Sequence, residues 1–297
     1  MRKMLVLIFV SAPAWAGWVE KYRSGESALA EGRPAIALDR LQAALKEAGI
    51  ARASDSQLAA VYDALGRAGM ARGCYREGKR NFELALRLAK DGPAETRVVL
   101  TSNLGQACQA LGEFVHAELL FRQAITAMPD RADIWNLLGG VLALQRRYPE
   151  AEEALRHALS NPADPASVTA HNDLAVIYQT RGKLHQAAAL YEQGISNSPA
   201  GQARARMLAN LGTLRLKLGN RAGALAALGR ALQEMETAVG PAHSDVAKVL
   251  EVYEPILRKA GRKTEAIAAA QRAKSIRSSF AGLDNATRAS VDYRDLK

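Results

Sequence analysis

The histidines and cysteines are the residues of this chain best suited to metal binding or nucleophilic catalysis. They are His116, His157, His171, His185 and His243, with Cys74 and Cys108. No His-x-x-x-His pair occurs, and no acidic partner stands at metal-ligand spacing. A Gly-x-Ser-x-Gly turn, a phosphate-binding loop and a dinucleotide fingerprint are also missing from the sequence. We therefore expect no catalytic residue, no metal site and no cofactor.

The two cysteines differ in their expected surroundings. Cys108 falls inside a predicted helix, at a place for a buried side chain of medium size, whereas Cys74 falls at a turn between two predicted helices. A disulfide needs Cα atoms roughly 4.4–6.8 Å apart, which a sequence does not establish. A disulfide and two free thiols both stay open, and we favour free, mostly buried thiols.

A pattern of about 34 residues recurs along the chain and indicates which elements position these side chains. In the third copy, Leu104, Cys108 and Leu111 are three or four residues apart and so share one face of a helix. Gly105 leaves room for a second helix to approach, and small alanines let Phe121 insert from it. The copies lie near residues 18–51, 59–92, 98–131, 132–165, 168–201, 205–238 and 247–280.

An isolated unit of this kind would leave apolar surface exposed on both sides. Stacking successive units covers that surface, which is why such units occur in arrays. Alanine and leucine are abundant and aromatic residues make up only 5% of the chain, which favours helices over sheet. The sequence therefore predicts an all-α solenoid of about seven helix-turn-helix repeats over residues 17–280. Pro255 is expected to kink the first helix of the last unit or to end it early.

The first sixteen residues have the composition of a secretory signal peptide. A basic start precedes an apolar stretch, and Ala14-Trp15-Ala16 fits the small-x-small rule for cleavage before Gly17. An uncleaved membrane anchor is disfavoured, because the apolar stretch is shorter than the roughly 17–25 residues that span a bilayer and contains Pro13. We expect an exported bacterial protein, periplasmic or secreted, with no transmembrane segment after cleavage. The polar tail, residues 281–297, lacks the repeat and is expected to be frayed or partly helical.

The charge of the chain is basic but diffuse. The formal net charge is +10, of which Arg2 and Lys3 belong to the leader. Basic residues are interspersed with acidic ones, and no basic tract with interleaved aromatic residues occurs. Nucleic acid is therefore not an expected partner, whereas anionic envelope polymers remain compatible with this charge.

The repeat resembles the tetratricopeptide repeat family. The resemblance is carried by Trp135-x-x-Leu138-Gly139, by Ala151, Leu155 and Ala158 after it, and by the units that begin at Val98 and Val168. It covers residues 18 to about 280. It implies a right-handed superhelix of helix pairs whose first helices line a concave groove. Members of the family usually bind peptides or other proteins in this groove and rarely catalyse reactions.

In that geometry, a set of amide and hydroxyl side chains on the first helices would lie on or beside the groove. They are Asn103, Gln106, Asn136, Asn172, Gln179, Asn210 and Thr213. An asparagine amide both donates and accepts hydrogen bonds, so a row of them would hold an extended peptide without reading its sequence. Two other interpretations stay open: the amides bond neighbouring helices, or they face water.

A second set of residues forms a predicted basic patch toward the carboxyl end. It comprises Arg206, Lys217, Lys248, Arg258 and Lys259. These charges would attract an acidic segment and speed its encounter. The alternative is an ordinary solvated helix face.

Taken together, these features favour a non-enzymatic scaffold that binds a peptide or protein in the cell envelope. Two alternatives stay open. One is a structural or assembly component of an envelope complex that self-associates as a homo-oligomer. The other is an accessory that binds an anionic envelope polymer, which would show as a steep dependence of binding on salt.

Overall fold

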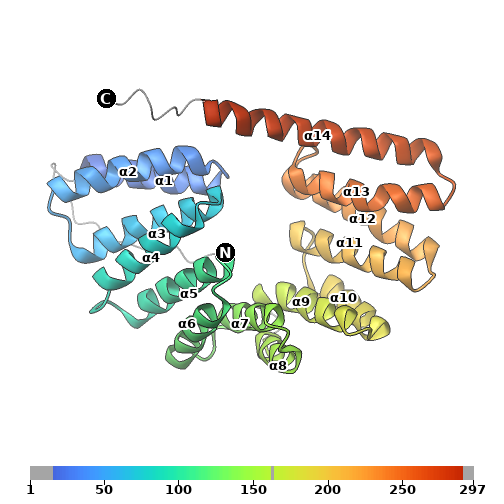
Figure 1. Ribbon diagram of the computed structural model, residues 1–297, viewed down its shortest axis with the longest axis horizontal. Coiled ribbons are helices and arrows are strands. Elements are labelled where there is room, and N and C mark those ends of the chain that lie inside the picture. Colours follow the sequence, from blue (N-terminus) through green and yellow to red (C-terminus); the bar gives the residue numbers. More distant parts are fainter. Residues whose placement is uncertain (1–15, 162–163, 290–297) are drawn as a thin grey trace. The chain divides into compact units, whose positions relative to one another are not determined.

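The chain folds entirely into helices over the part that its structure describes. The structure is a computed structural model and describes residues 16–161 and 164–289 of the 297. Within these ranges the chain forms fourteen α-helices and no strand (Figure 1). Consecutive helices pair as hairpins, so the predicted all-α fold of about seven helix-turn-helix repeats is confirmed. The predicted leader lies outside the described residues, except for Ala16.

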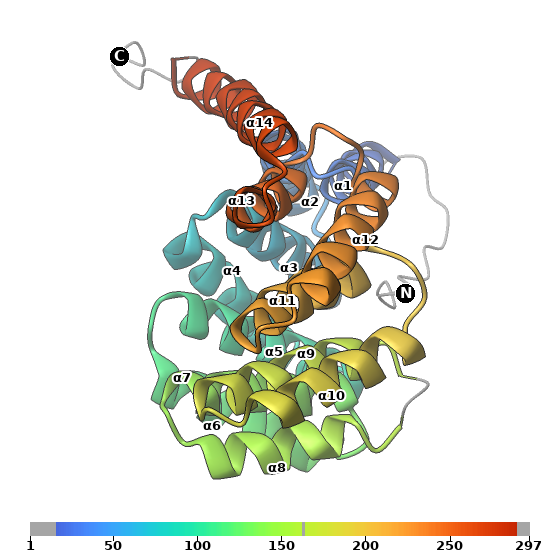
Figure 2. The ribbon, with the colours of Figure 1, turned by 90° about the vertical axis from the view of Figure 1, so that its right-hand side faces the viewer.

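The hairpins divide between two compact units, Met1–Ala158 and Leu159–Lys297, which are described separately below. The helices of the first unit are α1 (Ala16–Ala30), α2 (Pro34–Ile50), α3 (Asp55–Arg72), α4 (Tyr75–Leu88), α5 (Ala94–Ala110), α6 (Phe114–Ala127), α7 (Ala132–Leu144) and α8 (Tyr148–Ala158). The helices of the second unit, several of which face the viewer in Figure 2, are α9 (Ala166–Thr180), α10 (Leu184–Asn197), α11 (Gln202–Lys217), α12 (Arg221–Val239), α13 (Ser244–Lys259) and α14 (Lys263–Ala289).

Close approach of the two helices in a hairpin depends on a small residue facing a large one. A Cβ atom at Gly105 of α5 would lie 2.5 Å from the ring of Phe121 on α6, and Phe121 is fully buried. Gly66 of α3 has the same relation to Phe82 of α4, at 2.4 Å. The expectation that Phe121 inserts beside Gly105 is therefore confirmed.

The turn inside a hairpin usually contains a residue with left-handed backbone. Gly112, after α5, has a φ of +78°, which glycine adopts at no steric cost. In the fourth hairpin the corresponding residue is Arg146, with a φ of 62°. A residue with a Cβ atom is disfavoured in this conformation, so this turn needs support from its neighbours.

The two helices of a repeat have different roles in stacking. Successive first helices contact one another in each unit: α1 with α3, α3 with α5 and α5 with α7, then α9 with α11 and α11 with α13. Each second helix packs on the first helix of the next repeat within its unit, as α2 does on α3. Successive second helices of the described chain do not pack on one another to the same extent. Successive first helices are therefore closer together than successive second helices. Each unit is curved, with its first helices on the concave side.

The last hairpin corrects one expectation about helix ends. Pro255 does not end α13, which continues to Lys259, so the expected early end is wrong. Proline removes its own backbone donor and its ring crowds the carbonyl group four residues earlier. The two residues that follow, Ile256 and Leu257, are buried and hold the helix against the core. In the same hairpin α14 continues past Phe280 to Ala289.

Two further features concern the hydrophobicity of the helices and the state of the cysteines. Among the described residues, every helix is too short or too polar to cross a membrane. Cys74, directly before α4, is half-buried, and Cys108 on α5 is buried; both are free thiols. The preferred interpretation of two free thiols agrees with this structure.

Candidate partner-binding site

A network of polar contacts joins the first helices of the first unit. Asp63 of α3 is only 7% exposed. Arg67, one turn later, donates from Nε to Asp63 Oδ2 at 2.9 Å and from Nη2 to Glu26 Oε1 of α1 at 2.6 Å. Asn103 of α5 donates from Nδ2 to Asp63 Oδ1 at 2.8 Å. We call these four residues the Asp63 network. Each oxygen of the buried Asp63 carboxylate accepts one hydrogen bond, and the network ties α1, α3 and α5 together.

The protonation of Arg67 in the Asp63 network is controlled by the two carboxylates beside it. Burial alone would lower the pKa of Arg67, but the charges of Asp63 and Glu26 outweigh burial and raise this pKa. Tyr22 of α1 lies in the same electrostatic environment, where burial and the charge of Glu26 raise its pKa. The guanidinium of Arg67 is therefore held in its charged form between two carboxylates.

A smaller network joins two first helices of the second unit. Asn210 of α11 donates from Nδ2 to Asn172 Oδ1 of α9 at 2.9 Å. Asn172 in turn donates from Nδ2 to Asp173 Oδ1 at 3.0 Å. Burial raises the pKa of Asp173, against the opposing effects of the Asn172 hydrogen bond and the charge of Arg206. We call Asn172, Asp173 and Asn210 the Asn172 network.

The structure places all seven predicted groove residues on first helices, and all seven are half-buried. On the first unit they are Asn103 and Gln106 of α5 and Asn136 of α7; on the second they are Asn172 and Gln179 of α9 and Asn210 and Thr213 of α11. Three of these residues, Asn103, Asn172 and Asn210, take part in the two networks. Bonding between neighbouring helices, one of the interpretations left open, is therefore what these three asparagines do.

Several of the predicted groove residues keep donors or acceptors that no group in the described part of the chain uses. Asn103 uses one N–H of its amide on Asp63, which leaves a second N–H and the carbonyl oxygen for a ligand. Asn136 has a buried Oδ1 atom that meets no hydrogen-bond donor within the described ranges. Thr213 donates to the backbone oxygen of Ala209 in its own helix. Structural bonding and ligand binding are therefore compatible on this surface.

The five residues of the predicted basic patch lie on two helices of the second unit. Arg206 and Lys217 are on α11, and Lys248, Arg258 and Lys259 are on α13; all are exposed. Two of them are paired within α13. Lys248 donates to Asp245 at 2.6 Å, and Arg258 donates to Glu254 at 2.8 Å. These ion pairs offset part of the positive charge that an acidic partner would meet.

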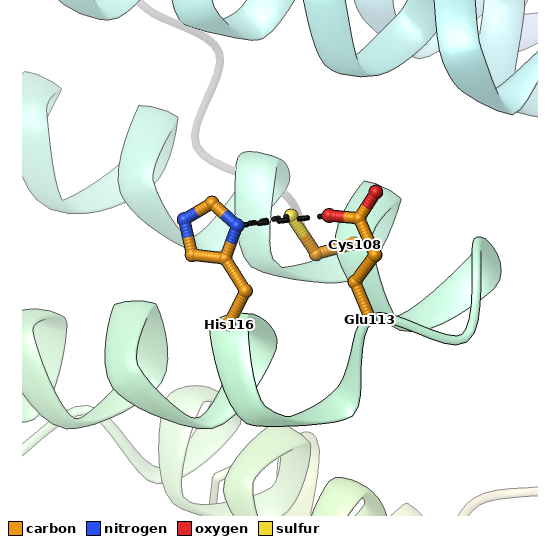
Figure 3. Close-up of side chains that lie close together, drawn as sticks. All are labelled: Cys108, Glu113 and His116. Carbon is orange, nitrogen blue, oxygen red and sulfur yellow. Dashed lines mark hydrogen bonds and ion pairs between the residues drawn. The ribbon is translucent and has the colours of Figure 1, made fainter.

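A cluster of metal-ligating side chains lies in the hairpin of α5 and α6 (Figure 3). Cys108, Glu113 and His116 present atoms that all lie within 4.8 Å of one another. The linear spacing does not indicate this cluster, because Cys108 belongs to the end of α5 and His116 to the beginning of α6. Spacing rules for one helix do not apply across a turn. The expectation of no metal site was based on linear spacing and stays a prediction, because these contacts join side chains across a turn.

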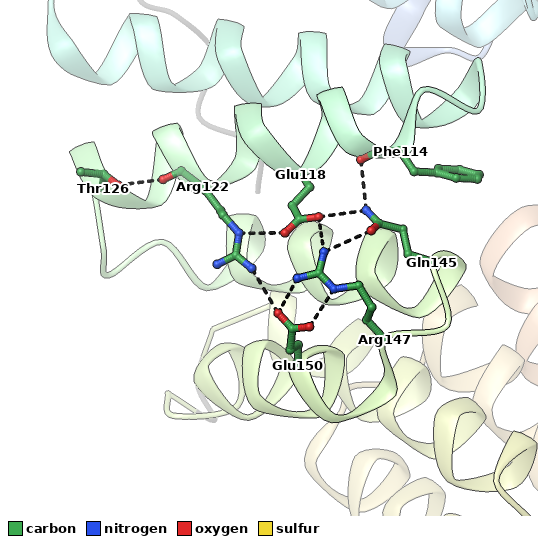
Figure 4. A network of polar contacts seen from close by, with 7 residues as sticks. All are labelled: Phe114, Glu118, Arg122, Thr126, Gln145, Arg147 and Glu150. Carbon is green, nitrogen blue, oxygen red and sulfur yellow. Dashed lines mark hydrogen bonds and ion pairs between the residues drawn. The ribbon is translucent and has the colours of Figure 1, made fainter.

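A third polar network supports the unusual turn at Arg146 (Figure 4). Glu118 of α6 accepts hydrogen bonds from Arg122, from Gln145 at 3.0 Å and from Arg147 at 2.6 Å. Arg147 also donates to both carboxylate oxygens of Glu150 on α8. Burial alone would raise the pKa of Glu118, but these three donors outweigh it and lower this pKa. The network holds the turn between α7 and α8 against α6, and its role is structural.

Comparison with protein families identifies the repeat. A tetratricopeptide repeat model matches residues 130–200, a second matches residues 204–245 and a third matches residues 100–134. A search of curated protein sequences finds no match.

Solved structures share the fold at low sequence identity. A tetratricopeptide repeat protein from Parabacteroides merdae is 17% identical, with a TM-score of 0.60 over 88% of this chain and 93% of that chain. PilF of Pseudomonas aeruginosa is 19% identical, with a TM-score of 0.58 over 75% of this chain and 93% of that chain. PilW, described as a widely conserved type IV pilus biogenesis factor, is 20% identical, with a TM-score of 0.53 over 75% of this chain and 92% of that chain.

These similarities agree with the architecture built from the residues. The matched segments fall on α5 to α12 and on the beginning of α13, where the glycine, alanine and large apolar positions recur most regularly. The hairpins outside them have the same helix-turn-helix form. The chain belongs to the tetratricopeptide repeat family.

Proposed function

We propose that this chain is a non-enzymatic scaffold that binds an extended peptide or protein segment on the first-helix side of its repeats, in the cell envelope. Tetratricopeptide repeat proteins are in general non-catalytic scaffolds that bind protein partners. One observation carries the proposal for this chain: half-buried amides follow successive first helices and keep unused donors and acceptors.

The arrangement of each unit supports a binding surface that exists before the partner arrives. The Asp63 network and the Asn172 network hold neighbouring first helices together without a ligand. A surface fixed in advance avoids the loss of conformational freedom that a flexible binder suffers on association. An extended segment has free backbone donors and acceptors, which amide side chains satisfy.

The proposed location depends on the leader-like residues 1–16, whose basic start, apolar core and cleavage site are typical of exported proteins. A second candidate function, assembly component of an envelope complex, is suggested by the fold shared with the pilus biogenesis factor PilW. Amino-terminal sequencing of the protein isolated from its own cells tests export: we expect a mature chain that begins at Gly17, and a chain that retains the leader would contradict it.

Site-specific photocrosslinking tests the binding surface without disturbing the helix–helix bonds. A photoreactive amino acid replaces Gln106 on α5 or Gln179 on α9, which are half-buried residues of first helices outside both networks. Matched controls replace Gln123 on α6 or Gln193 on α10, which are exposed glutamines of second helices. In intact cells, we expect adducts with a partner protein from the first pair and few from the second.

The pattern of adducts distinguishes the alternatives. Adducts that form mainly from the second-helix controls would move the binding surface to the other side of the repeats. Adducts that contain only a second copy of this chain would instead support the self-associating assembly component. Crosslinks only to glycan or lipopolysaccharide would support binding of an anionic envelope polymer.

A further inference from the structure

Three side chains of different chemistry converge at the turn of the third hairpin. Cys108 lies near the end of α5, Glu113 directly precedes α6 and His116 lies in the first turn of α6. The Cys108 Sγ atom is 3.6 Å from His116 Nδ1, and His116 Nδ1 is 3.6 Å from Glu113 Oε2. All three side chains point toward one small region (Figure 3). Because residues 108–116 supply every atom, the arrangement depends on a single hairpin.

A nucleophilic cysteine is the first function that such a set of residues suggests, and the geometry argues against it. A catalytic triad uses the two nitrogens of the histidine for different partners, one for the nucleophile and one for the carboxylate. Here Cys108 and Glu113 both approach Nδ1 of His116. Burial also raises the pKa of Cys108 to about 11, against the opposing charge of Lys79, so the sulfur is a thiol in the metal-free protein.

Convergence on one point is instead the geometry that a metal ion requires. Zinc–sulfur and zinc–nitrogen bonds of about 2.3 and 2.0 Å, at a tetrahedral angle, place the two ligand atoms roughly 3.5 Å apart. The observed Sγ–Nδ1 separation of 3.6 Å is close to this value. We propose that Cys108, Glu113 and His116 bind one Zn²⁺ ion, with a fourth position left for water or a partner's side chain.

The chemistry of the donors favours zinc over other common divalent ions. Thiolate and imidazole are soft or borderline ligands that suit Zn²⁺, whereas Mg²⁺ and Ca²⁺ prefer oxygen ligands only. Side chains of His116 and Glu113 are 46% and 39% exposed, so an ion can reach the site from solvent. Cys108 is buried behind them and would close the inner side.

Lys79 competes with the ion for Glu113. The Lys79 Nζ atom of α4 donates to Glu113 Oε2 at 2.5 Å, so the cluster already balances one positive charge. Zinc binding requires the ammonium group to move away and the thiol to lose its proton, as metal-bound thiols do. The hydrogen bond to Glu113 is the main cause of the raised pKa of Lys79, and the charge of Glu83, four residues later on the same helix, adds to it. The lysine can therefore leave Glu113 without losing all of its charge compensation.

Metal titration of the full chain tests the proposal. Protein freed of metal with a chelator is titrated with Zn²⁺ against a chromophoric indicator, and Co²⁺ is used as a spectroscopic probe. We expect one ion per chain and a thiolate-to-cobalt charge-transfer band.

Substitutions in the cluster should change the affinity for Zn²⁺. His116→Gln and Cys108→Ser should each weaken binding at least tenfold. His116→Gln alters an exposed side chain at the surface of the hairpin, so the fold should be retained, which circular dichroism checks. Lys79→Met should strengthen binding by removing the competing cation.

Matched controls separate this site from adventitious binding. Cys74→Ser and His157→Gln change a cysteine and a histidine outside the cluster and should leave stoichiometry and affinity unchanged. No binding to the wild-type chain, a cobalt spectrum without the thiolate band, or binding that survives Cys108→Ser would each overturn the proposal. Crosslinking at Gln106 and Gln179 reports on partner binding independently of these results.

Discussion

The two units connect their first helices with different chemistry. In the first unit a buried carboxylate, Asp63, accepts from a guanidinium and from an amide. In the second unit Asn210 and Asn172 join two helices through neutral amides. The carboxylate there, Asp173, accepts from Asn172 alone among the hydrogen bonds described. The same structural task, holding neighbouring repeats together, is thus carried by paired charges in one unit and by amides in the other.

This difference indicates where each unit is vulnerable. A buried ion pair adds little net stability compared with apolar packing, but removal of one partner leaves a charge without compensation in a buried place. A neutral hydrogen bond contributes less and costs less to lose. The first unit should therefore be sensitive to single substitutions in its network, whereas the second should tolerate them and respond instead to the protonation of Asp173.

Removal of the guanidinium should give the largest effect. In Arg67→Met, Asp63 and Glu26 lose their shared partner while most of the aliphatic stem is kept. We expect the free energy of unfolding to fall by about 3 kcal/mol, measured by urea denaturation. Hydrogen exchange should increase in α1, α3 and α5. The control is Arg80→Met, an exposed arginine of α4; an equal loss in both variants would contradict the role of the Asp63 network.

A comparison of the two asparagines should give the second largest effect. Asn103→Ala removes a donor to a charged carboxylate, whereas Asn210→Ala removes a donor to a neutral amide. Hydrogen bonds to charged groups are the stronger class, so we expect losses of about 1.5 kcal/mol for Asn103→Ala and about 0.5 kcal/mol for Asn210→Ala. Thermal and urea unfolding measure both. A larger loss of unfolding free energy for Asn210→Ala than for Asn103→Ala would contradict the stronger hydrogen bond that we assign to the Asp63 network.

The pH dependence of Asp173→Asn should be the smallest effect. Burial raises the pKa of Asp173 in the folded protein above its unfolded value, so the folded state favours the protonated acid. The contribution of Asp173 to the free energy of unfolding is therefore fully present below its unfolded pKa. This contribution is lost as the pH rises through the raised pKa of the folded state. Asp173→Asn should stabilise the chain at neutral pH by on the order of 0.5 kcal/mol and have no effect at pH values below the unfolded pKa.

The measurement for Asp173→Asn is the midpoint of urea unfolding at several pH values. Asp39→Asn on α2, an exposed aspartate, is the control and should show no such pH dependence. Equal stability of the wild type and Asp173→Asn at every pH would show that the Asp173 carboxyl is not unfavourably buried.

The fold could be predicted from the sequence because its determinants are local and repeated. Gly105 and Phe121 are sixteen residues apart along the chain, as are Gly66 and Phe82, and each pair marks one hairpin. The effect of Pro255 was not predictable in the same way. Whether a helix continues past a proline depends on what anchors the next turn, which here is the burial of the following residues in the core.

The sites were less predictable than the fold because they join residues from different helices. The asparagines were identified from their type, but the partner of Asn103 is Asp63, forty residues earlier, at a place where the repeat pattern does not call for an acid. The Cys108 cluster spans a turn, so no helical spacing rule indicates it. A search for cysteine, histidine and acidic residues across the predicted turn between Leu111 and Phe114 would have found it.

The pairing of Asn103 with Asp63 also means that the hairpins are not interchangeable modules. Asn103 precedes Leu104-Gly105, and Leu137 occupies the same place before Leu138-Gly139 in the next repeat. Deletion of α5 and α6 would therefore set a leucine opposite a carboxylate that had lost its amide donor. Loss of this repeat during evolution would be penalised at this junction, although the apolar surfaces of neighbouring hairpins still matched. In this unit, the hydrogen bond between Asn103 and Asp63 makes the packing of these hairpins depend on their order along the chain.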